Sequence, residues 1–300
     1  MLDLAPVDLK SAPEVARAFP AQHAANGIRY ASFGETQISG ENLEQLVQAV
    51  PRTIATALAR KTYYFVPLTL GESLSSEADE AAFSETNPDR VMIAAGYSSE
   101  LSDAAICHRN VNLAGMECTF ISTRLMQDRF ALAFEFYINA GHQFVDAAGV
   151  PESFMKLAWS QAESGVRGET SQDAWEYRMK AGGQASMDPP ESRGLAPRPK
   201  VRRLRTQTES PLTSLPEETR PQQNAVDEKA RSDYFNAAFA DAIAIYLLSL
   251  TVDFDYAELR EREYPLLAAP ALAERLRLIA QIFPPNNGYE FSLRYRRRER

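Results

Sequence analysis

The chain has 300 residues, of which 45% are hydrophobic and 10% aromatic, so it can bury a substantial core and belongs to the soluble globular class. Its net charge is −8, from 40 acidic and 32 basic residues. An acidic balance argues against broad nucleic-acid binding over the whole surface, because phosphate contacts require dense Lys and Arg.

The N-terminus and the apolar stretches argue against export. Asp3 and Asp8 stand where a signal peptide carries positive charge. The most apolar stretch, residues 243–252, is about half of the ~20 residues that a membrane span requires. Two cysteines, Cys107 and Cys118, are too few for a secreted disulfide framework. A single bridge between them is possible, but two free, buried thiols are favoured. The sequence therefore predicts a cytoplasmic protein with no membrane segment.

The first third of the chain predicts a helix followed by strands. Apolar residues recur at helical spacing over residues 41–61, and Pro51 is expected to divide this helix into two pieces. Residues 62–70 and 91–97 are aromatic, β-branched or otherwise apolar and predict two strands. After the second strand, Ser98 or Ser99 can cap a short helix across residues 100–108.

The middle of the chain leaves one alternative open. Residues 116–123 favour a strand. Residues 129–138 alternate strictly and could complete a hairpin with that strand. The same residues also fit a helix that starts at Asp128 and ends at Gly149, and their Ala, Leu and Glu content favours the helix. A further helix is expected after Pro151.

Residues 181–226 mark the clearest boundary. This segment holds seven prolines, no aromatic residue and no isoleucine, so it cannot bury enough surface to offset an ordering entropy of roughly 1–2 kcal/mol per residue. We expect it to be a disordered linker or binding segment.

The remaining residues predict helices and a final strand. Residues 228–250 are apolar on nearly all sides, so this helix is expected to be buried and to complete the core of the preceding part. Pro270 opens another helix, and the alternation in residues 289–296 predicts a closing strand.

The expected architecture is a helix-rich α+β domain with a few antiparallel strands, interrupted by a long disordered segment. Residues 1–29 form an N-terminal extension and residues 30–180 the first part of the core. The linker spans residues 181–226, and residues 227–300 complete the core and end in a basic tail.

One polar stripe could carry chemistry. If residues 128–148 form a helix, five polar side chains fall on one side of it, and they are Asp128, Glu135, Asn139, His142 and Asp146. A carboxylate and an imidazole on nearby turns can share a proton or a metal ion, which makes Glu135 and His142 the candidate catalytic residues. The opposite side of this helix is apolar, so the stripe is also where solvent would be expected.

Two other groups of acidic residues could hold a metal ion. The first contains Glu100, Asp103, Cys107, His108, Glu117 and Cys118. On a regular helix the neighbours Cys107 and His108 would point ~100° apart and could not bind the same metal ion. The second is Asp253 with Asp255, which could hold a hard cation or simply form a solvated turn. With three histidines and no zinc-binding, phosphate-binding or hydrolase motif, neither a metal nor a cofactor follows from the sequence.

Positive charge is concentrated in two short segments. Residues 198–205 carry Arg198, Lys200, Arg202, Arg203 and Arg205. Residues 294–300 carry five arginines and one glutamate and include Arg296, Arg297 and Arg298. Setting aside the net +5 and +4 of these segments leaves −17 on the rest of the chain. A basic motif within a disordered segment can fold onto a partner as it binds.

Three functional hypotheses follow. The first is a non-enzymatic interaction or adaptor protein that binds another protein through the basic linker. The second is an enzyme that uses Glu135 and His142 for acid–base or metal-dependent chemistry. The third is a nucleic-acid-binding protein that uses the arginine clusters. The partner, the substrate and the oligomeric state do not follow from the sequence.

Overall fold

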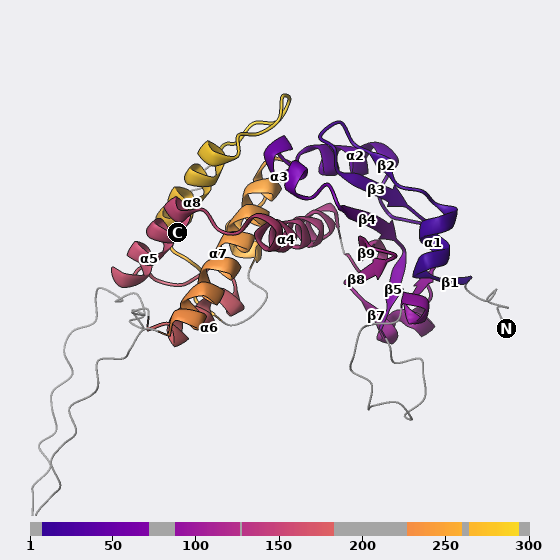
Figure 1. Cartoon of the computed structure of the whole chain (residues 1–300), viewed down its shortest axis with the longest axis horizontal. Helices are drawn as coiled ribbons and strands as arrows, with labels where there is room; N and C mark the ends of the chain where they lie inside the picture. Colours follow the sequence, from indigo (N-terminus) through magenta and orange to yellow (C-terminus); the bar gives the residue numbers. More distant parts are fainter. Residues whose placement is uncertain (1–7, 72–87, 127, 183–226, 260–263, 294–300) are drawn as a thin grey trace, which may run out of the picture.

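The computed structural model describes residues 8–71, 88–126, 128–182, 227–259 and 264–293. These residues form an α+β fold, as expected. Figure 1 shows the strands gathered on one side of the molecule and helices α5 to α8 on the other, with α4 between the two groups. None of the helices within these ranges combines the length and the apolar character required to cross a bilayer.

The larger sheet has five strands in the order β2-β3-β4-β9-β8. Their bounds are Gln22–His23 (β2), Arg29–Ser32 (β3), Lys61–Val66 (β4), Met116–Ser122 (β9) and His108–Leu113 (β8). The central pairs β3–β4 and β4–β9 are parallel, whereas β2 and β8 are antiparallel edge strands. Side chains alternate across β4, so that Tyr63 and Phe65 join the cluster beneath the helices and Tyr64 and Val66 join the cluster on the opposite face.

The smaller sheet is antiparallel, in the order β1-β6-β5-β7. Its strands are Leu9–Ser11 (β1), Met92–Ala94 (β6), Leu68–Leu70 (β5) and Ala105–Ile106 (β7). The single strand expected over residues 62–70 is divided at Pro67 into β4 and β5, because proline has no N–H to donate to a ladder. The first residues, which the sequence assigned to an extension, contribute β1, β2 and helix α1 (Ala12–Ala18).

Helices α2 (Gly40–Gln48) and α3 (Arg52–Ala57) pack on the face of the larger sheet that carries Tyr63 and Phe65 (Figure 1). Pro51 separates them as expected and is the residue that precedes α3. The short helix expected across residues 100–108 is a 3₁₀ helix, η3, that ends at Ala104. Residues after Ala104 form β7 and β8 instead, because each finds a partner strand, β5 and β9. Three further 3₁₀ helices are Pro88–Arg90 (η2), Thr123–Leu125 (η4) and Tyr256–Leu259 (η5).

Helix α4 (Arg129–Ala148) resolves the alternative left open by the sequence in favour of the helix. Its first turn is capped by Asp128, whose side chain accepts a hydrogen bond from the backbone N–H of Ala131 over 2.9 Å. Its last turn ends at Gly149, which has φ +73°. These two caps are local signals that a hairpin would not use.

Four more helices complete the fold: α5 (Glu152–Glu163), α6 (Gln172–Lys180), α7 (Glu228–Ser249) and α8 (Ala269–Ile282). The helix α7 is buried along most of its length, as expected for a helix that is apolar on nearly all sides. Most of its buried residues belong to one hydrophobic cluster with buried residues of α2, α3, α4, α5, α8 and β4.

Helices α4 and α7 approach each other closely. A Cβ atom at Gly141 of α4 would lie 2.6 Å from the backbone oxygen of Ala240 of α7. Glycine is therefore required at this position by the packing of the two backbones.

Two further predictions concern the closing strand over residues 289–296 and the linker over residues 181–226. The closing strand predicted over residues 289–296 is wrong for the described residues 289–293, which form no strand. These residues contact helices rather than a sheet edge: the Tyr289 hydroxyl donates to the backbone oxygen of Gln45, and the Phe291 ring packs on Tyr246. A strand requires a partner strand, and none is present there. Apart from Ala181, which is the C-cap of α6, and Gly182 in the turn that follows, the predicted linker 181–226 lies outside the described residues.

Candidate functional site

A cavity of about 270 Å³ lies where the helical layer meets β8. Its walls are the start of β8, one side of α4, the middle of α7, the first turn of α6 with the residues before it, and the side chains of Leu259 and Tyr264. These segments are far apart in the sequence. The ionisable groups in the wall are His108, Glu135, His142, Asp173 and Asp241, together with Tyr264.

His108 and Glu135 form a close pair in this wall. The Nδ1 atom of His108 lies 2.6 Å from Oε1 of Glu135, and the two side chains are 40% and 17% exposed. A carboxylate can only accept, so Nδ1 is the donor and Nε2 is the nitrogen that can exchange a proton with a ligand. Asn139, one turn along α4, donates to the same Oε1 over 3.1 Å and to the Glu135 backbone oxygen over 2.8 Å. The carboxylate is thus held in place from two sides.

A chain of polar contacts anchors α4 on the sheet beside this pair. The Tyr63 hydroxyl donates to Oε1 of Gln143 over 2.8 Å, and Nε2 of Gln143 donates to the Thr119 hydroxyl over 2.7 Å. The Thr119 hydroxyl in turn donates to Oδ1 of Asn110 over 2.7 Å. Gln143 lies two turns beyond Glu135 on α4, and Asn110 lies two residues beyond His108 on β8. The same two elements are therefore joined at two successive points, which fixes the imidazole relative to its carboxylate.

Asp241 lines the cavity from α7 and is only 5% exposed. The Thr170 hydroxyl donates to its Oδ2 over 3.0 Å. Burial raises the pKa of Asp241 from 3.8 to about 6, against the opposing effects of a hydrogen bond from Ser171, the charge of His142 and the hydrogen bond from Thr170. A carboxyl group with this pKa exchanges its proton near neutral pH, and perturbed acids in a cavity are frequent at functional sites.

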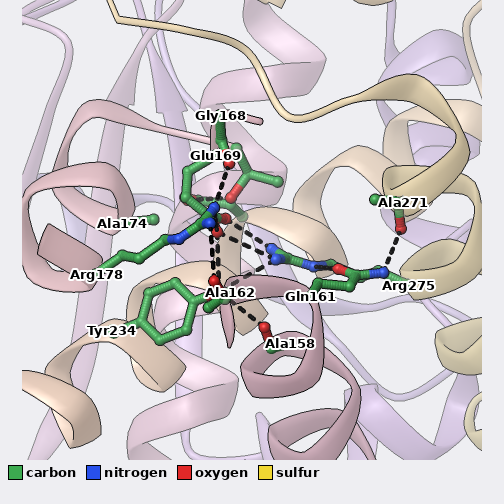
Figure 2. A network of polar contacts seen from close by, with 12 residues as sticks. Ala158, Gln161, Ala162, Gly168, Glu169, Ala174, Arg178, Tyr234, Ala271 and Arg275 are labelled. Atoms are coloured by element: carbon green, nitrogen blue, oxygen red, sulfur yellow. Dashed lines mark hydrogen bonds and ion pairs between the residues drawn. The ribbon is translucent and has the colours of Figure 1, made fainter. Parts of the chain in front are cut away.

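A buried ion cluster supports the residues that touch Asp241. Arg178 of α6 and Arg275 of α8 approach Glu169 from opposite sides (Figure 2), and their guanidinium nitrogens lie 3.2 Å and 2.8 Å from its carboxylate. Tyr234 of α7 donates to Oε1 of Glu169 over 2.8 Å. Burial raises the pKa of Tyr234, so its hydroxyl stays protonated and remains a donor.

This cluster connects helices α5, α6, α7 and α8 behind the cavity. All three charged side chains are fully buried, and Arg178 also donates to the backbone oxygens of Gly168, Ala162 and Val166. Because Thr170 and Ser171 directly follow Glu169, the cluster fixes the two hydroxyls that hydrogen-bond Asp241. Ser171 also caps α6 by accepting from the backbone N–H of Ala174 over 3.1 Å.

No family model, no curated protein and no solved structure matches this chain.

The expected partnership between Glu135 and His142 differs from the observed geometry. Both residues line the same cavity, but the imidazole within hydrogen-bonding distance of Glu135 is that of His108. His142 is exposed and lies close enough to Asp241 for its charge to act on that carboxyl. The reason is the docking of α4: the row Glu135, Asn139 and Gln143 faces β8, whereas His142 lies on the neighbouring row.

Asn139 from the polar stripe and His108 from the first cluster join Glu135 at the site, whereas Asp128 and Asp146 do not line the cavity. Asp128 caps α4, and Asp146 is exposed near its end. In the first cluster, Cys107 and Cys118 are both free and Cys118 is buried, as expected, but Cys107 is exposed and not buried. The register of β8 with β9 places Cys118 opposite Val111, four residues away from Cys107.

The structure places no metal centre within the described ranges. No group of three or more His, Cys, Asp or Glu side chains there is arranged to hold a metal ion. Asp253 and Asp255 are both exposed. The partner-binding residues predicted in segments 198–205 and 294–300 lie outside the described residues.

The sequence reasoning missed Asp241 and its neighbours, although one signal was present. Asp241 is the only charged residue between Phe235 and Leu250, in a helix that is otherwise apolar. A charge within a helix that must be buried requires a compensating role. The pairing of His108 with Glu135 has no such local signal, because 27 residues separate them and only the contact between β8 and α4 brings them together.

Proposed function

We propose that the cavity is an acid–base catalytic site for a small molecule, in which His108 transfers the proton and Glu135 orients it. The observation that carries this proposal is the 2.6 Å contact between His108 Nδ1 and Glu135 Oε1 at the wall of the cavity. Engagement of Nδ1 leaves Nε2 for a ligand or a water molecule. Removing a proton from such a partner is the ordinary task of a neutral imidazole held by a carboxylate.

The surroundings of the pair suit this role. Asn139 holds the carboxylate of Glu135 that orients the ring, and the hydrogen bond from Gln143 to Thr119 joins α4 to β9 beside it. Asp241 supplies a second titrating group in the same cavity, on the α7 wall, with a pKa near 6. Two proton-exchanging groups on different walls of one cavity permit an acid and a base to act on the same ligand.

The test compares two variants that each lack one imidazole, that of His108 in the cavity or that of His23 outside it. A mixture of small neutral and cationic metabolites is incubated with the protein, and consumption is followed by mass spectrometry. We expect turnover by the wild-type protein that falls roughly 10²- to 10⁴-fold in His108→Gln. The matched control is His23→Gln, because His23 is exposed on β2 and does not line the cavity.

Glu135 is expected to act through His108 as a positioning residue. The variant Glu135→Gln should lower kcat with little change in KM, since a misoriented imidazole impairs proton transfer and not ligand binding. A His108→Gln variant with full activity, or a Glu135→Gln variant that changes only KM, would contradict the assignment.

The interaction hypothesis is a separate proposal. The charge contrast between the basic segments and the acidic remainder supports electrostatic binding of another protein, or of nucleic acid, through residues 198–205 and 294–300. Deleting residues 183–226 should abolish partner recovery in a pull-down. Nucleic-acid binding would show a steep salt dependence that disappears when Arg296, Arg297 and Arg298 are replaced by uncharged residues. Unchanged partner recovery would contradict the protein-binding proposal, and binding that does not depend on salt would contradict the nucleic-acid-binding proposal.

A further inference from the structure

The wall of the cavity is acidic. It contains three carboxylates, those of Glu135, Asp173 and Asp241, and two imidazoles, and none of the described residues that line it is Lys or Arg. The buried arginines of the Glu169 cluster lie behind the wall and are engaged there. Among the described residues of the wall, a bound anion would thus meet carboxylates and no permanent positive charge.

Asp241 is the most deeply buried of these carboxylates. It is 5% exposed, and within the described residues no Lys or Arg forms an ion pair with it. Two hydroxyls, those of Thr170 and Ser171, donate to it, whereas an ionised carboxylate offers about four acceptor positions. A buried carboxylate without a cationic partner is unfavourable unless a positive group joins it or it takes up a proton.

Apolar side chains flank Asp241 on the same wall. Ala237 and Ile245 lie one turn before and one turn after it on α7, and both line the cavity. Ile138 of α4 and Leu259 of η5 add to this apolar surface. The volume of about 270 Å³ lies at the lower end of ligand cavities, which restricts the ligand to a small molecule.

We propose that the cavity binds a small organic cation whose ammonium group contacts Asp241 and whose apolar part lies against Ile245 and Leu259. This inference rests on the function proposed above for the same cavity and names the class of its substrate. The ammonium donates to the acceptor positions that Thr170 and Ser171 leave on the carboxylate. The apolar part covers the α7 wall, and His108 stands on the β8 side of the bound molecule.

The charges around Asp241 predict how binding depends on pH. The groups that face it are His142 from α4, Glu169 and the two hydroxyls before α6, and Tyr256 from η5. The remaining ionisable groups of the wall are His108, Glu135, Asp173 and Tyr264. As the pH falls through about 6, Asp241 takes up a proton and loses its attraction for a cation.

The experiment measures binding of three probes of similar size and different charge: benzylamine, benzyl alcohol and benzoate. Isothermal titration calorimetry at pH 7.5 on the full chain should give the tightest binding for benzylamine and none for benzoate. Asp241→Asn should weaken benzylamine roughly 10- to 100-fold, the effect of removing a charged hydrogen bond. Asp146→Asn, which removes an exposed carboxylate from α4, is the matched control and should change nothing.

The pH dependence supplies a measurement that needs no variant. Benzylamine stays protonated between pH 5 and pH 7.5, so its affinity for the wild-type protein should fall about tenfold over this range as Asp241 is neutralised. His142→Gln should retain most of this fall. Equal binding of benzyl alcohol, tighter binding of benzoate, or a pH response that Asp241→Asn leaves intact would each overturn the inference.

The two proposals fail in different ways. His108→Gln should bind benzylamine as the wild-type protein does, since the imidazole is assigned to proton transfer and not to the ammonium. Binding that depends on Asp241, together with turnover that ignores His108, would refute the catalytic proposal alone. Turnover that depends on His108, together with ligands that bind independently of Asp241, would refute the cation site alone.

Discussion

Replacing Asp241 by asparagine is expected to stabilise the protein at neutral and alkaline pH. Burial raises the pKa of this carboxyl from 3.8 to about 6, so the folded state binds its proton more tightly than the unfolded state. The resulting contribution to stability is complete below pH 3.8 and is lost as the pH rises to about 6. A difference of about two pKa units corresponds to about 3 kcal/mol, and roughly half of it is lost by pH 5.

The assay is urea unfolding of the wild-type protein and Asp241→Asn between pH 5 and pH 8, with linear extrapolation to water. Asparagine keeps an oxygen for the Thr170 hydroxyl but carries no charge, so the stability of the variant does not include this titration. We expect the variant to gain about 1 kcal/mol on the wild-type protein over this pH range. Asp146→Asn, on the exposed end of α4, should give a difference within about 0.5 kcal/mol at every pH. Parallel stability profiles for Asp241→Asn and the wild type would refute the assignment of a raised pKa.

Two further substitutions test the packing behind the cavity. Gly141→Ala places a methyl group 2.6 Å from the backbone oxygen of Ala240 and should cost about 1–3 kcal/mol of unfolding free energy, measured by urea denaturation. Glu169→Gln leaves two buried guanidinium groups without their counter-ion and should cost about 3–5 kcal/mol in the same assay.

Matched controls separate these effects from a general sensitivity to substitution. Gly40→Ala adds a methyl group to α2 where nothing lies within 4 Å, and Glu176→Gln removes a carboxylate from an exposed ion pair on α6. Each control should change the unfolding free energy by less than about 1 kcal/mol. A control as damaging as its partner would show that the close contact or the buried charge is not the cause.

The fold was predictable wherever the deciding signal was local. The pair Asp128 and Gly149 bounds α4 by capping, and capping distinguishes a helix from a hairpin even where the apolar residues alternate. The prediction for residues 289–293 was wrong because alternation describes a half-buried extended chain, whether or not a neighbouring strand exists. Helix α6 has a weak apolar pattern and was not predicted, although Ser171 is an ordinary cap.

The candidate site was predictable only in part. Glu135 was predicted as a site residue because it lies on the polar stripe of α4. Its partner, however, depends on which row of α4 side chains faces strand β8. That choice is made by the contacts of Gln143 with Thr119 and Asn110, which join residues from three elements. Spacing within one helix holds no information about such a contact. Asp241 could have been predicted as a site residue because it is the one charged residue in an apolar stretch of α7. A single acidic residue in a helix that must be buried therefore indicates a candidate site even where no motif is present.

The close approach of Gly141 to Ala240 also determines how the cavity can vary. Each residue immediately precedes a polar group of the wall, His142 on α4 and Asp241 on α7. The separation of these two groups is thus set by the close approach of the two main chains. It does not depend on the other side chains that line the cavity. Exchanges at Ile138, Ile245 or Leu259 can reshape the interior for a different molecule while the span between imidazole and carboxylate stays constant. One methyl group at the crossing would widen that span at once.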